Sequence, residues 1–221
     1  MKIVANLNWA QSVKGQAIPL YQSEENPTDG LLWIGGVHGD EPEGVELASK
    51  TLKWLHSSEA NPNFPWSLIP CLNPDGVTLM QRMNANAVDL NRNYPSKDWS
   101  SEHKKQRYFP GNSAGSEPET QALVALIEKI KPKLIVHCHS WKPCIVYSGE
   151  GGAIAAKKLA DASGYTAQTH IGYDTPGSLS SYASKDLGIP VICIEEQDHI
   201  DLKYVWPRFQ NGVKSIFNEG F

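Results

Sequence analysis

Four short apolar segments stand out in the hydrophobic pattern of this chain, at residues 31–37, 67–72, 134–138 and 191–194. The first, third and fourth are rich in β-branched residues and almost free of charge, which is typical of strands that are covered on both faces. We therefore predict that these segments are strands of one buried sheet.

Helical periodicity fills the intervals between the strands. The spacing of apolar residues predicts helices over residues 42–56, 122–130, 153–162 and 202–217. The second of these helices follows Ser116 and Glu119, whose spacing is that of a capping box. The alternation of strands and helices predicts an α/β fold with a largely parallel sheet between helical layers, and we find no domain boundary within residues 1–221.

Polar residues follow each of the predicted strands. They are His38 and Glu41, Asn73 and Asp75, His139 and Ser140, and Glu195 and Glu196. In an open parallel sheet, ligands bind beyond the carboxyl ends of the strands, so this shared placement predicts a single site. Residues 73–112 have poor periodicity and many polar side chains, and a loop of this length is usually functional.

Composition and charge narrow the functions open to this chain. It has 221 residues and a net charge of −4, with a pI near 6.0, so no basic footprint indicates nucleic acid or an anionic membrane as a partner. No apolar run approaches the roughly 18–20 residues that span a bilayer, and residues 1–8 lack the apolar core of a secretion signal. Nothing in the sequence implies an obligate protein partner.

The four cysteines, Cys71, Cys138, Cys144 and Cys193, are spread along the chain, and three of them lie in apolar strand contexts. This pattern suits buried, reduced thiols and predicts a cytoplasmic protein. No Cys-x-x-Cys pair occurs, which argues against a structural zinc held by sulfur. A disulfide between Cys138 and Cys193 is the alternative.

His38 and Glu41 are three residues apart in a glycine-rich turn, so an imidazole and a carboxylate can close on one small cation. A hydrolytic zinc site needs a third protein ligand and one open position. His139 is favoured because it lies nearer the carboxyl end of its strand than His137, which points to the same face. His137 is then a competing ligand or the partner of a ligand. The other histidines are expected to be bystanders: His56, His103, His170 and His199.

Glu195 is the favoured general base of such a site. A water molecule at a zinc site needs a base that takes its proton and passes it to the leaving amine. Glu195 directly follows a dry strand, where burial can raise the pKa of a carboxyl group. Glu196 would face the opposite way on an extended chain, and a structural ion pair is the alternative role for Glu195.

Residues 82–95 contain two arginines, Arg82 and Arg92, in a stretch with little core-forming character. A guanidinium group presents a planar fork that suits a carboxylate or a developing oxyanion. By spacing alone, a substrate clamp and a solvated loop are equally good interpretations of this segment.

Taken together, these motifs resemble the zinc metallocarboxypeptidase family, because they occur in the family's order over about 160 residues. The matching pieces are His38-x-x-Glu41, Asn73-Pro74-Asp75-Gly76, Val88-Asp89-Leu90-Asn91-Arg92-Asn93, His139-Ser140 and Ile194-Glu195. The resemblance implies a single-domain, three-layer α/β/α sandwich with a mixed, largely parallel twisted sheet. It also implies one Zn²⁺ per chain, held by His38, Glu41 and His139, with Glu195 as general base.

The resemblance extends to the substrate side of the site. Arg92 with Asn91 matches the pair that holds a substrate carboxylate, and Arg82 resembles the arginine that stabilises the oxyanion. Residues 172–179 resemble the family loop that carries a mobile active-site tyrosine, here Tyr173. The implied activity is hydrolysis of an amide bond next to a free carboxylate in a small peptide.

The loop around Tyr173 is closer to that of the small bacterial murein peptide amidases, cytoplasmic enzymes that cut the γ-D-glutamyl–diaminopimelate bond of recycled cell-wall peptides. One departure from the family is Ala87, which stands where glycine is usual. The alternatives are a general zinc carboxypeptidase, an N-acyl amino acid deacylase of the aspartoacylase or succinylglutamate desuccinylase type, and a catalytically silent peptide-binding module. The Asn-Pro-Asp-Gly and Asn-Arg-Asn-Tyr-Pro stretches favour the peptidase side over the deacylases.

Overall fold

An eight-stranded mixed sheet forms the middle layer of the protein, whose computed structural model describes residues 3–149 and 151–221. The strands are β1 (Val4–Gln11), β2 (Ala17–Gln22), β3 (Leu31–Ile34), β4 (Trp66–Ile69), β5 (Leu134–Trp141), β6 (Cys144–Ser148), β7 (Ala167–Gln168) and β8 (Val191–Gln197). They lie in the order β1-β2-β4-β3-β5-β8-β6-β7. The central strands β4, β3, β5 and β8 are parallel, whereas β2 and β6 pair antiparallel with β4 and β8. The carboxyl ends of the central strands therefore meet at one edge.

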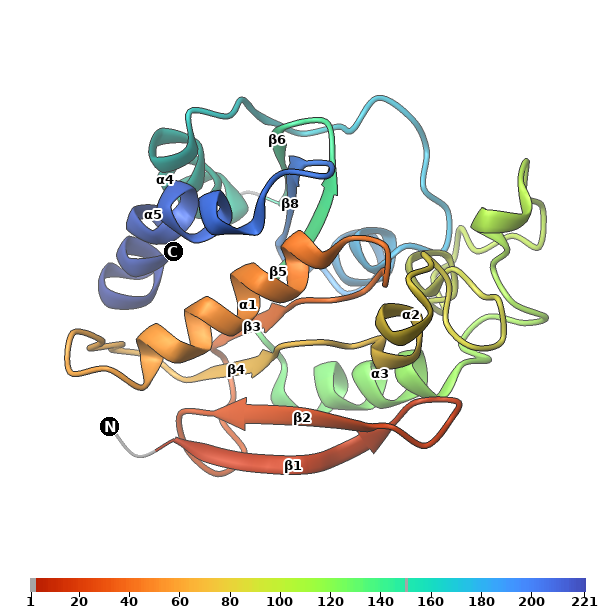
Figure 1. The fold of residues 1–221 in the computed structure, drawn as a ribbon, viewed down its shortest axis with the longest axis horizontal. Coiled ribbons are helices and arrows are strands. Elements are labelled where there is room, and N and C mark those ends of the chain that lie inside the picture. The colour runs from red at the N-terminus through yellow and green to blue at the C-terminus, as the bar shows by residue number, and fades with distance from the viewer. Residues whose placement is uncertain (1–2, 150) are drawn as a thin grey trace.

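Helices cover both faces of the sheet (Figure 1). The α-helices are α1 (Pro42–Leu55), α2 (Pro74–Leu79), α3 (Pro118–Ile130), α4 (Gly152–Ser163) and α5 (Val205–Glu219). Short 3₁₀ turns span Leu90–Arg92, Gln106–Tyr108 and Leu202–Tyr204, and a π-helical segment spans Ser181–Asp186. Buried side chains of α1, α4 and α5 pack on one face of the sheet and those of α3 on the other. This arrangement is the predicted α/β/α sandwich.

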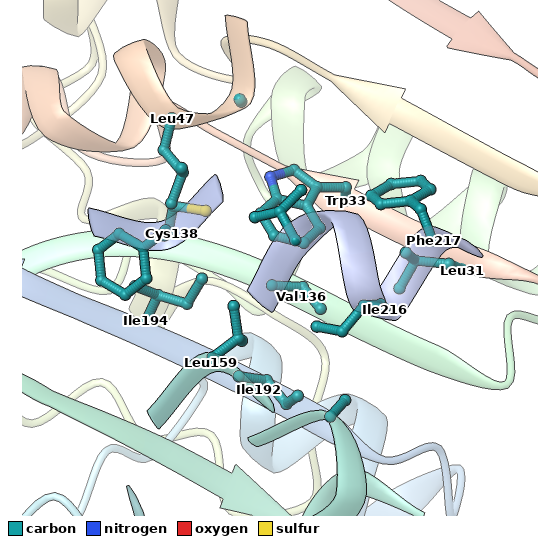
Figure 2. Packing of buried hydrophobic residues seen from close by; sticks show 14 of the residues in the cluster. Leu31, Trp33, Leu47, Val136, Cys138, Leu159, Ile192, Ile194, Ile216 and Phe217 are labelled. Carbon is teal, nitrogen blue, oxygen red and sulfur yellow. The ribbon is translucent and has the colours of Figure 1, made fainter. Parts of the chain in front are cut away.

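Large apolar side chains join the sheet to its helices. Trp33 on β3 is fully buried and lies among Leu47 of α1 and Ile216 and Phe217 of α5 (Figure 2). The rings of Trp33 and Phe217 have centroids 5.9 Å apart. Burial of this much aromatic surface fixes β3 and its neighbours, and thus the places where the loops leave the strands.

The central strands differ from the predicted ones at their ends. β3 stops at Ile34 because Gly36 adopts a φ of +58°, which turns the chain out of the sheet. β5 and β8 continue beyond their predicted ends, so His139 and Glu195 lie within strands rather than after them. The hairpin of β1 and β2 was not predicted, because its exposed residues weaken the hydrophobic pattern.

The predicted capping box at Ser116 and Glu119 is wrong. α3 begins at Pro118, and its N-cap, Glu117, makes no capping hydrogen bond through its side chain. The Ser116 hydroxyl donates to Glu117 Oε1 (2.6 Å), and Glu119 Oε1 accepts from the backbone N–H of Val13 (3.1 Å). The carboxylate of Glu119 thus ties α3 to the N-terminal hairpin instead of closing the first turn.

All four cysteines are free thiols, so the alternative of a Cys138–Cys193 disulfide is wrong. The two residues are not paired in the sheet, since Cys193 lies opposite His137 and Cys138 opposite Ile194. Among the described helices, none is both long enough and apolar enough to cross a membrane.

Candidate metal centre and active site

The parallel pairing of β5 and β8 sets two pairs of polar residues side by side. His139 lies opposite Glu195, and two residues earlier His137 lies opposite Cys193. Residues two apart on a strand share a face, so these four side chains form a patch on one face of the sheet. All four are buried, with at most 8% of their surface exposed.

His38 and Glu41 reach this patch from the loop between β3 and α1. Gly39 within this loop touches the first turn of α2, because a Cβ added to Gly39 would lie 1.8 Å from the carbonyl carbon of Gly76. Only glycine permits this close approach. The Asn73 side chain caps α2 by accepting from the Gly76 N–H (2.9 Å) and donates to the Val37 carbonyl (3.2 Å). The first turn of α2 therefore supports the loop that carries both side chains.

The structure brings together the three residues that the sequence selects as metal ligands. His38 Nδ1 lies 2.8 Å from Glu41 Oε1, and His139 Nδ1 lies 2.8 Å from Glu41 Oε2. The two Nδ1 atoms are 3.0 Å apart. Two imidazole nitrogens and a carboxylate thus converge on one point at the wall of a cavity.

This donor set fits zinc, which takes nitrogen and oxygen ligands and in catalytic sites leaves one position open. The second nitrogen of each imidazole also has a partner: His38 Nε2 lies 3.1 Å from Asp89 Oδ1, and His139 Nε2 lies 2.9 Å from His137 Nδ1. Metal-binding histidines almost always use their other ring nitrogen in this way, which fixes the tautomer and the ring orientation. The three residues could therefore hold a zinc ion.

His137 belongs to a second candidate group, with His139 and Cys193, whose ligand atoms also lie within 4.8 Å of one another. That group contains no carboxylate, and its two histidines face each other, with His137 Nδ1 2.9 Å from His139 Nε2. Burial, together with the nearby His139 and His38, holds the pKa of His137 well below its usual range. A neutral His137 can accept a hydrogen bond from the Nε2–H of His139, which suits a partner of a ligand better than a ligand.

Glu195 is buried among these groups, with 6% of its surface exposed. Burial and the nearby charge of Glu41 raise its pKa to about 7. The Cys193 thiol donates to Glu195 Oε1 at 3.3 Å, which favours the charged carboxylate and opposes part of that rise. A carboxyl group with a pKa near neutrality can both take up and release a proton.

Glu196 faces the opposite side of the sheet, as the sequence predicts for the residue after Glu195. Its Oε1 accepts hydrogen bonds from Arg208 of α5 and from the Tyr165 hydroxyl. This carboxylate therefore forms a structural ion pair with Arg208 of α5 and does not line the cavity.

Arg82 reaches the metal-ligand group from the loop after α2. Its Nη1 donates to Glu41 Oε1 (3.0 Å) and its Nε to Asp89 Oδ2 (2.9 Å). Asp89 is fully buried and contacts both Arg82 and His38. It was given no role from the sequence, although it stands within a matched motif, and it is the carboxylate that orients His38.

Asn91 and Arg92 are held against the segment that follows Tyr173. The Asn91 side-chain oxygen accepts from the Leu179 N–H (3.0 Å), and Gly177 lies so close to Arg92 that a Cβ there would be 2.2 Å from the Arg92 carbonyl oxygen. The Arg92 Nη1 donates to the Asn91 carbonyl (2.6 Å). These contacts point the guanidinium group of Arg92 into the cavity that the metal-ligand group borders.

The cavity has a volume of about 580 Å³ and connects all the predicted site residues. Tyr173 lies at its mouth, 46% exposed, with its ring edge-on to that of Trp141 (centroids 5.6 Å apart). Of the four bystander histidines, His170 and His199 do line the cavity. Ala87 adopts a φ of +58°, a conformation that suits the glycine usual at this position better than alanine.

Cys193 and Asp89 are the functional candidates that sequence reasoning missed. Cys193 was interpreted as a buried strand thiol, and its contact with Glu195 follows the two-residue spacing of a strand. The same spacing places His137 and His139 on one face of their strand. Applied to Cys193 and Glu195, it would have indicated this contact from the sequence.

Comparison with known proteins found a matching family and similar proteins. Residues 2–152 match the zinc carboxypeptidase family. The chain is 32% identical to murein peptide amidase A of Escherichia coli over 214 residues, which cover 90% of this chain and 86% of that protein.

Solved structures show the same fold. The crystal structure of the murein-tripeptide amidase from Escherichia coli matches with a TM-score of 0.77 and 31% identity, over 97% of this chain and 91% of that chain. Bovine thrombin-activatable fibrinolysis inhibitor matches with a TM-score of 0.79 over 98% of this chain and 88% of that chain, and at 20% identity this likeness concerns the fold alone.

Proposed function

This chain belongs to the zinc carboxypeptidase family, and we propose that it hydrolyses the γ-D-glutamyl–diaminopimelate bond of murein peptides. It is a hydrolytic enzyme, as its family and its amidase relatives indicate. Support for the chemistry comes above all from one observation: Glu195, with a pKa near 7, lies directly across the sheet from His139 in a shared cavity. Support for the substrate comes from the likeness to murein peptide amidases.

In this proposal His38, Glu41 and His139 hold one zinc ion per chain. A bound zinc ion polarises a carbonyl group and makes a water molecule acidic near neutral pH. Asp89 and His137 orient the two imidazoles through their second nitrogens.

Glu195 takes the proton of the attacking water and gives it to the nitrogen of the leaving diaminopimelate. Its burial excludes bulk water, and its pKa near 7 allows both transfers. Arg82 lies beside Glu41 and stabilises the negative charge that develops on the carbonyl oxygen. Arg92 and Asn91 hold the free carboxylate next to the scissile bond.

Tyr173 closes over the bound peptide from the mouth of the cavity. Its ring is half exposed and contacts Trp141, which also lines the cavity. We place the reaction in the cytoplasm, in the recycling of cell-wall peptides, where four free thiols remain reduced.

A comparison of three substrate classes tests the proposed function. Purified zinc-loaded enzyme is incubated with L-alanyl-γ-D-glutamyl-diaminopimelate, with α-linked peptides of L-residues, and with N-acetyl and N-succinyl amino acids. We expect the first to be cleaved fastest, with release of free diaminopimelate. Faster cleavage of ordinary C-terminal residues would identify a general carboxypeptidase, and faster cleavage of acyl amino acids would identify a deacylase.

The thiol of Cys193 should shift the acid limb of the pH profile, whose position the pKa of Glu195 sets. Only the carboxylate form of Glu195 accepts a proton, so kcat/KM should rise as pH increases through its pKa. Replacing Cys193 by alanine removes a donor that favours the carboxylate, so the limb should move to higher pH by roughly 0.5–1 unit. Cys193→Ser keeps a donor and should move it less. A limb that stays in place in both variants, with zinc content constant across the pH range, would contradict the role of this contact.

Replacing Arg92 by lysine should lower kcat/KM for the tripeptide about 10- to 100-fold, mainly through KM. Lysine keeps the charge but loses the planar fork that binds a carboxylate with two parallel hydrogen bonds. The measurement compares the tripeptide with an analogue in which the diaminopimelate carboxylate next to the scissile bond is converted to an amide. An equal loss on both substrates would show that Arg92 does not bind this carboxylate.

A further inference from the structure

One aromatic ring at the rim of the cavity is surrounded by three guanidinium groups. The Tyr108 ring centroid lies 5.4 Å from the Cζ of Arg82, 5.8 Å from that of Arg92 and 5.6 Å from that of Arg107. All four side chains line the cavity. The proposed function uses Arg82 and Arg92, and it leaves Arg107 without a role.

Arg82 and Arg107 differ in how strongly they already pair with carboxylates of the protein. The Arg82 side chain is 12% exposed and paired with two carboxylates, those of Glu41 and Asp89. Arg107 is 51% exposed, and its ion pair in the described structure is a single contact of 3.4 Å from Nη2 to Asp40 Oδ2. An exposed pair at this distance contributes little to stability. Most of the Arg107 fork is therefore available to a carboxylate.

The position of Arg107 indicates on which side of the scissile bond a substrate carboxylate bound to it would lie. Asp40, which Arg107 contacts, directly precedes the metal-ligand candidate Glu41, and the Arg107 side chain is 51% exposed, so Arg107 lies near the metal-ligand group at the solvent-exposed rim of the cavity. Other residues that line the cavity are buried, among them His137 and Cys193. A peptide cleaved next to its terminal residue places that residue inside and its acyl portion toward the rim. Arg107 therefore faces the acyl portion.

We propose that Arg107 binds a second carboxylate of the substrate, the free α-carboxylate of a γ-linked glutamyl residue on the acyl side of the scissile bond. This inference rests on the proposed function and deepens it. In a γ-linked glutamyl residue the γ-carbonyl forms the bond that is cut and the α-carboxylate stays free, whereas in an ordinary α-linked peptide the α-carbonyl itself forms that bond and no free α-carboxylate remains on the acyl side. Arg107 thus favours γ-linked over α-linked peptides, while Arg92 holds the terminal carboxylate that both kinds share.

A substrate pair isolates this contact. One substrate is L-alanyl-γ-D-glutamyl-diaminopimelate, and the other is the same peptide with the glutamyl α-carboxylate converted to an amide. In Arg107→Gln, kcat/KM for the first should fall about 10- to 100-fold, mainly through KM, because a hydrogen-bonded charge pair is lost. Its kcat/KM for the amidated peptide should stay within about twofold of the parent. Arg107→Lys should recover part of the loss, since it keeps the charge without the fork.

Lys142→Gln is the matched control, because Lys142 is also an exposed cation over an aromatic ring, 4.9 Å from the centroid of Trp141, at a neighbouring hollow. It should affect the two substrates equally. Equal losses on both substrates in Arg107→Gln, or no loss on either, would overturn the assignment of Arg107.

Measurements of peptide binding distinguish a failure of this inference from a failure of the proposed function. Dissociation constants of both peptides are measured for the Glu195→Gln variant and for the double variant that carries Glu195→Gln and Arg107→Gln. If the parent cleaves neither peptide, the proposed function fails. The Arg107 assignment then stands if Arg107→Gln weakens only the peptide with the free α-carboxylate, and it falls if both affinities change alike.

Discussion

Replacing Glu195 by glutamine should leave zinc and substrate binding intact and reduce kcat by about 10²- to 10⁴-fold, the usual contribution of a general base. Glutamine has nearly the same shape and can still accept the hydrogen bond from Cys193 through its amide oxygen. Its amide cannot take up the proton of the attacking water. The loss should therefore appear in kcat rather than in KM.

The measurement combines steady-state kinetics with zinc content and a substrate dissociation constant. Glu196→Gln is the matched control, because it makes the same change one residue later on the other face of β8, where the carboxylate contacts Arg208 and Tyr165. We expect that variant to lose stability and keep kcat. A Glu195→Gln enzyme within about tenfold of the parent would exclude Glu195 as the base.

Replacing His139 by alanine should remove zinc and with it the activity, because one of three protein ligands is lost. His137→Ala should instead keep one zinc ion and bind it about 10- to 100-fold more weakly, the usual effect of removing the partner of a metal-binding histidine. The reason is that His137 Nδ1 lies 2.9 Å from the Nε2 of His139 and holds that ring in place.

Zinc affinity is measured by competition with a chelator, and zinc content after dialysis. His137→Gln offers an acceptor for the Nε2–H of His139 and should restore part of the affinity. If His139→Ala kept its zinc while His137→Ala lost it, the assignment of His139 as the ligand would be wrong.

Local sequence was sufficient to predict the central layers and to select residues that the structure brings together around one cavity. The segments that became β3, β5 and β8 are apolar enough to be interpreted as buried strands, and a parallel sheet places their carboxyl ends at one edge. His38 and Glu41 could be paired because three residues in a glycine turn bring two side chains together. The motif order then supplied the roles expected for Arg82 and Arg92.

Local signals failed where the outcome depends on distant partners. The capping-box spacing at Ser116 was present, but Glu119 bonds to Val13 in a hairpin 106 residues away in sequence. The hairpin itself has too many exposed residues for its strands to be recognised, and it is stabilised by pairing with β4.

Tertiary structure alone decided how the site residues face one another. The choice between His137 and His139 depends on which imidazole meets Glu41, a residue 98 positions earlier in the sequence. The position of Glu195 opposite His139 is a matter of register between β5 and β8. Register is set by the packing of whole strands against α1, α4 and α5, and a slip of one residue would turn Glu195 to the other face. The sequence by itself therefore determined which side chains could do the chemistry, and the long-range packing of the sheet decided which of them meet.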